Sequence, residues 1–223
     1  MNFLQLCNRV KSEAGISGAE LVSVKDQRGE MARVVQWTCN AYIEIQNMRD
    51  WTWLWQSLQH VLTPGKAVYD PLTDFGVPAL AWKPKRFYLY DQDEGRRARR
   101  PIYCEEWGEF DAYYTDPEAQ SGRPGELSVR PDRSIVFSCA PDRHYMFEGE
   151  FRLTPERLTE NTDAPSMPEQ YHMAIVWMAV QTYAQYEEAT TLYELATMRL
   201  ANYLGQMMNT ELEGCFAFGG PLA

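Results

Sequence analysis

Residues 166–208 read SMPEQYHMAIVWMAVQTYAQYEEATTLYELATMRLANYLGQMM, and this stretch decides the fold of the chain. Ser166 and Glu169 have the spacing of a capping box, with a proline in the first turn, so the pattern predicts that a helix begins at Ser166. We expect this helix to end near Glu188 and a second helix to run from Thr190. The sequence therefore predicts a helical pair.

The first helix of the pair carries apolar residues on two faces. One stripe consists of Tyr171, Ile175, Met178, Thr182 and Tyr186, and the other of Met173, Trp177, Val180 and Ala184. A helix that is apolar all round must be covered on every side. We therefore expect one stripe to face the chain's own core. The second, with Trp177, Val180 and nearby Tyr183, is expected to contact another copy of the chain or a neighbouring protein.

The rest of the chain predicts an α+β fold. A capping-box pattern at Asn2 predicts a short first helix, and three-to-four spacing from Asp26 to Met48 predicts a longer one. From Trp51 the apolar period changes to two, and proline and glycine then separate short candidate strands as far as Pro168. We expect a helical bundle built from N-terminal and C-terminal helices, with a central antiparallel, β-rich and loop-rich insertion. The expected segments are 1–50, 51–165, 166–212 and an extended tail, 213–223.

Composition limits the function. The chain has 223 residues and a formal net charge of −10, which argues against a body that wraps nucleic acid through its phosphates. Its five cysteines are odd in number and never form a CxxC pair, a pattern typical of reduced thiols. Neither a run of about 18 apolar residues nor a signal peptide is recognisable, so we expect synthesis in a cytoplasm-like compartment and no membrane contact.

Motifs for catalysis or cofactor binding are not recognisable in the sequence. His60, His144 and His172 lack metal-ligand spacing, and no phosphate-binding glycine motif occurs. Cys139 and His144 could be a nucleophile and its base, but their spacing across a proline is more typical of residues that flank a turn. We predict no catalytic residue, no cofactor and no metal. The alternative is a hydrolase that uses Glu105 or Glu106 as its acid.

Two further segments are candidate contact sites. One is a basic cluster within an acidic chain, Arg96, Arg97, Arg99 and Arg100. In one interpretation these arginines contact DNA phosphates or an acidic partner, and contact with DNA would suit a nucleic-acid-binding module. In the other they keep the edge of a hairpin soluble. The other is the glycine-rich tail, where Phe216 and Phe218 are either anchors on a partner or part of a frayed terminus.

The order of several short fragments resembles the head-to-tail adaptor (connector) proteins of tailed bacteriophages. The fragments that carry the resemblance are 4–10, 13–18, 27–37, 45–46, 50–54, 86–90, 116–117, 122–124, 141–145, 149–151 and 162–165. Each fragment is short, and their order along the chain makes the resemblance specific.

The resemblance implies a non-enzymatic virion protein at the head–tail junction. It implies a homo-oligomeric ring of about twelve copies, with the portal protein above and tail or nozzle proteins below. Genomic DNA would pass through the lumen without sequence-specific binding. The expected role agrees with the second apolar stripe, because a closed ring needs two different complementary surfaces on each subunit.

Overall fold

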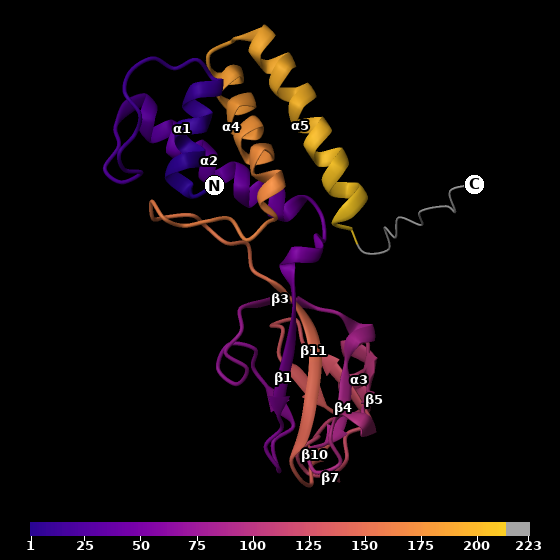
Figure 1. The fold of residues 1–223 in the computed structure, drawn as a ribbon. Helices are drawn as coiled ribbons and strands as arrows, with labels where there is room; N and C mark the ends of the chain where they lie inside the picture. Colours follow the sequence, from indigo (N-terminus) through magenta and orange to yellow (C-terminus); the bar gives the residue numbers. More distant parts are fainter. Residues whose placement is uncertain (213–223) are drawn as a thin grey trace, which may run out of the picture. The chain divides into compact units, whose positions relative to one another are not determined.

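The computed structural model describes residues 1–212 and has an α+β architecture (Figure 1). Helices lie toward both ends of the described sequence, and strands occupy its centre. The chain divides into two compact units. The first, here called the helical unit, comprises residues 1–54 and 155–212 of the described chain. The second, here called the β unit, comprises residues 55–154.

The helical unit contains α1 (Phe3–Glu13), α2 (Gly29–Met48), α4 (His172–Tyr186) and α5 (Thr190–Thr210). The predicted capping box starts α1, since the Asn2 side chain accepts from the Gln5 amide and the Gln5 side chain accepts from the Asn2 amide, both at 2.9 Å. Helix α4 packs against α1, α2 and α5, so it is the most enclosed helix of this unit (Figure 1). The apolar interior of the unit is organised around it.

The predicted start of the third long helix at Ser166 is wrong. Residues Glu169–Tyr171 form a 3₁₀ turn, and the α-helix begins only at His172. The Ser166 amide and hydroxyl bond to the Tyr42 hydroxyl instead, at 2.9 and 3.0 Å, so Ser166 does not cap a helix. Proline also disfavours helical backbone at the residue before it, which blocks an earlier start. Helix α5 begins at Thr190, as predicted.

The expected strand opening at Trp51 is also wrong. Thr52–Leu54 form a 3₁₀ turn, and β1 starts at Trp55. The Trp51 ring is buried, stacks on Trp53 with centroids 5.0 Å apart, and donates from Nε1 to the Ile45 carbonyl at 2.6 Å. Packing of the Trp51 and Trp53 rings, with a single bridge from Trp51 to Leu212, accounts for the first two tryptophans, and only Trp55 lies in a strand.

The β unit contains two main sheets and one short helix. In the five-stranded sheet, β11 (Tyr145–Leu153) pairs with β1 (Trp55–Val61), β3 (Ala79–Trp82) and β4 (Tyr88–Asp91), and β5 (Arg100–Pro101) extends β4 at the edge. The four-stranded sheet has the order β2 (Val68–Tyr69), β9 (Ile135–Phe137), β8 (Glu126–Val129), β6 (Tyr103–Glu105). A small pair joins β7 (Ser121–Gly122) and β10 (Ala140–Pro141), and α3 (Trp107–Tyr113) follows β6.

Strand pairing is not uniformly antiparallel, contrary to the expectation from the sequence. The β6–β8 and β7–β10 pairs are parallel. Parallel strands need a long crossover, and the segment that contains α3 supplies one between β6 and β8.

The two main sheets of the β unit pack face to face. Phe137 of β9 and Phe147 of β11 meet edge to face with centroids 5.4 Å apart, and buried residues from both sheets form one core. Because side chains alternate along a strand, Glu148 and Glu150 project from the opposite, outer face of the five-stranded sheet. In the same way Leu127 points inward and Glu126 outward in the four-stranded sheet.

Candidate interaction surfaces

The second apolar stripe of α4 is covered by the chain itself. Val180 has no exposed surface and Trp177 is 7% exposed. Tyr183 is half-buried, with its ring 6.1 Å from the Trp37 ring in an edge-on contact. The expectation that this stripe needs a partner to cover it is wrong, because α1, α2 and α5 of the same chain enclose α4.

Exposed apolar side chains lie instead on α5. Leu195 and Met198 are 40% and 54% exposed, and Met208 is 37% exposed. Positions 195, 198, 201, 205 and 208 follow helical spacing along one side of α5, with Ala201 and Gly205 between the larger residues. After Arg199 the helix contains no charged residue, although the chain as a whole is 23% charged. This face of α5 is therefore a candidate contact surface. The interpretation of the sequence had placed such a surface on α4 instead.

The predicted arginine loop has two different kinds of arginine. The 3₁₀ turn η3 (Arg96–Ala98) precedes β5. Arg96 and Arg99 form ion pairs with the Glu148 carboxylate at 3.1 and 2.9 Å, and Glu148 is 5% exposed. The Arg99 guanidinium also lies 4.0 Å from the centre of the Tyr88 ring. These two arginines therefore fix the loop to the outer face of the five-stranded sheet.

The other two arginines of the loop are directed to solvent. Arg97 and Arg100 are exposed, and within residues 1–212 neither forms an ion pair or side-chain hydrogen bond. Of the four arginines predicted to contact DNA or an acidic partner, these two are the ones whose guanidinium groups remain open to a partner.

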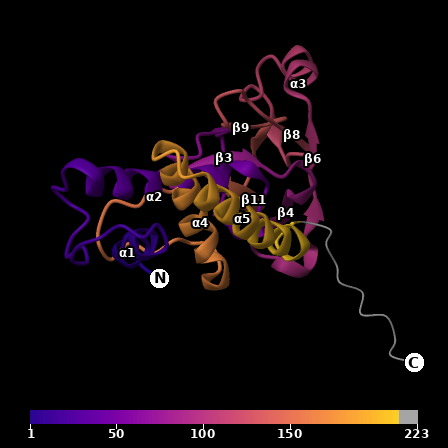
Figure 2. The same ribbon diagram turned by 90° about the horizontal axis from the view of Figure 1, so that it is seen from above.

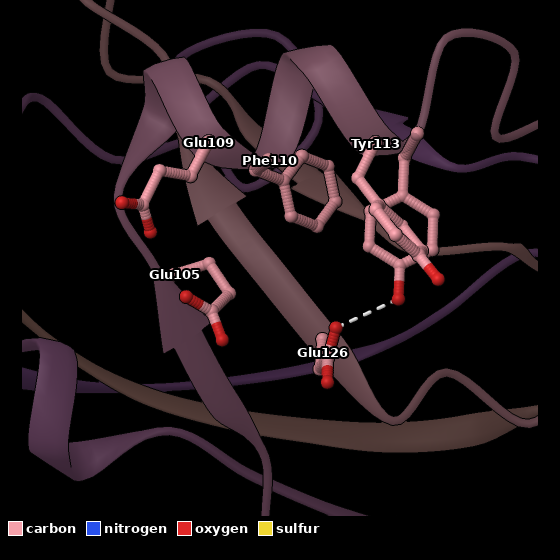
Figure 3. A pocket seen from close by; sticks show the side chains of 6 residues that line it. Glu105, Glu109, Phe110, Tyr113 and Glu126 are labelled. Atoms are coloured by element: carbon pink, nitrogen blue, oxygen red, sulfur yellow. Dashed lines mark hydrogen bonds between the residues drawn. The ribbon is translucent and has the colours of Figure 1, made fainter.

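An acidic, aromatic groove lies under α3 (Figure 3). Its volume is about 300 Å³, and its lining residues are Glu105, Glu109, Phe110, Tyr113, Tyr114 and Glu126. Glu105 and Glu126 come from the adjacent parallel strands β6 and β8, and Figure 3 shows their side chains beneath the helix that carries Glu109. The Tyr114 hydroxyl donates to Glu126 at 2.7 Å, and this hydrogen bond raises the pKa of Tyr114 to about 12.

The groove contains one of the two glutamates named as candidate acids. Glu105 lines it, whereas the exposed Glu106 accepts a hydrogen bond from the Glu109 amide at 3.2 Å and so caps α3. The Glu105–Glu106 pair is thus divided between a groove and a helix cap. The groove was missed because Glu109 and Glu126 come from elements that only the crossover brings together.

The remaining candidates for chemistry are not arranged as a site. His144 is exposed, and its Nδ1 lies 3.3 Å from the Leu62 carbonyl oxygen. Burial raises the pKa of the Cys139 thiol, which works against nucleophilic use. Within residues 1–212, no group of three His, Cys, Asp or Glu side chains could hold a metal ion. Phe216 and Phe218 lie outside the described residues.

The described residues thus present three candidate contact surfaces, which are the exposed apolar face of α5, the two open arginines and the acidic groove. A family model described as SU10 adaptor protein matches residues 1–215, so the chain belongs to this family of phage head-to-tail adaptors. The resemblance predicted from the ordered fragments is confirmed. No sequence match was found among the curated proteins.

Family membership makes the chain a phage virion component that associates with other virion proteins. None of the helices between residues 1 and 212 combines the length and apolar character needed to cross a bilayer.

Proposed function

We propose that this protein is a non-enzymatic head-to-tail adaptor that forms a ring of about twelve copies between the portal and the tail or nozzle proteins. The observation that carries this proposal is the match of the SU10 adaptor family over residues 1–215, nearly the whole chain. In this role the genome passes through the lumen of the ring without sequence-specific binding. A formal net charge of −10 supports such a passage, because an acidic wall repels the phosphates of DNA.

The helical unit is proposed to act as a bundle that presents α5 to its neighbours. Exposed Leu195 and Met198, together with the uncharged second half of α5, form a surface that a subunit or the portal would cover. Burial of apolar surface is the main favourable term in most protein associations. Trp177 and Val180 then contribute indirectly, since they hold α4 in the interior against which α5 packs.

The tail is the second proposed contact. Phe216 and Phe218 are large apolar side chains within a glycine-rich sequence, a composition suited to a short peptide anchor that docks on the portal or on a neighbouring subunit. Deletion of residues 213–223 is expected to weaken portal binding and to leave the melting temperature of the free protein unchanged. Replacement of both phenylalanines by alanine should reproduce the deletion if the rings are the anchors.

Size-exclusion chromatography with light scattering, on the protein alone and mixed with portal, tests the proposal. The expected result is a species of about twelve chains, formed alone or on the portal. Electron microscopy of the same fraction should show a ring stacked on the portal. A folded chain that stays monomeric in both mixtures and does not co-elute with portal would overturn the proposed function.

A further inference from the structure

The β unit carries unpaired charges of opposite sign on two separate surfaces. Its positive surface is the arginine loop, where Glu148 fixes Arg96 and Arg99 and leaves Arg97 and Arg100 exposed. Glu148 projects from the outer face of the five-stranded sheet, so Arg96 and Arg99, which pair with it, lie on that face. Arg100 is on the edge strand β5, opposite the buried Leu89, so it lies on the other side of the sheet edge. A fixed loop loses little conformational entropy when it binds.

The negative surface is the groove beneath α3. Tyr103 and Glu105 point to the same side of β6, and the register places Tyr103 beside Glu126 of β8. This side is the outer face of the four-stranded sheet, because the alternate residue Leu127 is buried in the core. Figure 2 shows α3 beside β6 and β8, on the side away from β4.

The chemistry of the groove fits a guanidinium group. Carboxylates accept paired hydrogen bonds from arginine, and aromatic faces attract its charge. Tyr113 and Tyr103, which are 82% and 67% exposed, are the most exposed aromatic side chains on the described surface. Neither Glu105 nor Glu109 forms a side-chain ion pair within residues 1–212, and no basic residue lines the groove.

We propose that Arg97 and Arg100 of one copy dock in the Glu105–Glu109–Glu126 groove of the next copy. A ring needs a heterologous interface, in which one surface of a subunit meets a different surface of its neighbour, and the two open arginines and the groove are different surfaces of one unit. Charge complementarity selects a second copy as the occupant, since both halves of the contact are present in every chain. This inference rests on the proposed ring and specifies the contact that sets its direction.

Charge reversal of each half provides the test. The first variant carries Arg97→Glu and Arg100→Glu, the second carries Glu105→Arg and Glu109→Arg, and the third carries all four changes. Each double variant should weaken self-association at least about tenfold, because two attractive pairs become repulsive. The quadruple variant restores opposite signs across the contact and should recover most of the loss. Sedimentation velocity against protein concentration measures the association, with portal added if rings form only on it.

A matched control separates this contact from a general effect of net charge. Lys85 and Arg133 are exposed cations of the β unit, and Lys85→Glu with Arg133→Glu changes the net charge as much as the arginine-loop variant does. This control should associate like the wild type in the same buffer. Wild-type association should also weaken between 50 and 300 mM salt. Circular dichroism melting of each variant verifies that it is folded.

The possible failures are distinct. If the wild type forms no ring with or without portal, the proposed function fails. A second outcome is that the wild type forms rings and the folded arginine-loop variant or the folded groove variant forms them equally well. In that case the proposed ring is retained and the proposed contact is wrong. Loss in both double variants without recovery in the quadruple variant would also overturn the pairing, because it would show that each surface meets a different partner.

Discussion

The replacement Val180→Ala decides whether the second stripe of α4 belongs to the core or to an interface. Val180 has no exposed surface in the single chain, so its truncation removes apolar contacts inside the helical unit. Loss of two carbon groups at about 0.8 kcal/mol each gives about 1.6 kcal/mol. The remaining cavity adds about 1 kcal/mol, and the higher helix propensity of alanine offsets about 0.5 kcal/mol. We expect the free energy of unfolding to fall by about 2 kcal/mol.

In a chain of this size, that loss corresponds to a melting temperature lower by about 4–8 °C. Thermal unfolding followed by circular dichroism at 222 nm measures the change on dilute, unassembled protein. Met198→Ala is the matched comparison, because Met198 is 54% exposed on α5. Its effect on melting should stay within about 0.5 kcal/mol, whereas its effect on ring formation or portal binding should be the larger of the two.

The two variants thus separate stability from assembly. If Val180→Ala leaves the melting temperature unchanged and weakens assembly, the residue acts at an interface, and the assignment of this stripe to the core is refuted. If Met198→Ala lowers the melting temperature as much as Val180→Ala does, the face of α5 is part of the interior rather than a contact surface.

Two other predictions follow from buried polar groups. Glu148→Gln removes the charge that holds Arg96 and Arg99, so the free energy of unfolding of the β unit, measured by urea denaturation, should fall by about 1–3 kcal/mol. Glu150→Gln is the comparison, because the ion pairs of Glu150 are more exposed. An equal loss in that variant would contradict the special role of Glu148. Burial lowers the pKa of His172 below its ordinary value of 6.5, so the unfolded chain binds more protons and stability falls as pH drops from 7.5 through 6.5. The melting temperature should therefore decrease toward pH 5.5, and His172→Gln should make it depend less on pH. If the variant shows the same pH dependence as the wild type, His172 is not the group responsible.

Local signals predicted those parts of the fold that depend on neighbouring residues. The capping box at Asn2 and the start of α5 at Thr190 were predicted correctly, because the chemistry that fixes them lies within one helical turn. The start of α4 was predicted incorrectly, because Ser166 forms a hydrogen bond with Tyr42, which is 124 residues away in the sequence. A capping pattern in the sequence cannot reveal that a distant hydroxyl competes for the same side chain.

The candidate surfaces depended still more on distant contacts. In the sequence the four arginines are equivalent, and only the register of β11 brings Glu148 to Arg96 and Arg99. Likewise, apolar residues on every face of α4 indicate complete burial, but not whether the covering surface comes from the same chain. In the structure α5 packs along α4 and supplies part of the covering surface from the same chain. The outer face of α5 remains exposed.

The division among the arginines also limits DNA binding by this loop. The logarithm of the affinity for duplex DNA falls linearly with the logarithm of the salt concentration, with a slope of about −0.9 for each phosphate that the protein neutralises. Four free arginines would therefore give about a 150-fold loss of affinity between 50 and 200 mM salt. With Arg96 and Arg99 held by Glu148, two remain, and the expected loss is only about 12-fold. Retention of duplex DNA by unassembled protein should therefore show a salt slope near −1.8, and serine at Arg97 and Arg100 should abolish it. A slope near −3.6 would mean that DNA displaces Glu148, and the loop would then be a nucleic-acid site rather than a protein contact.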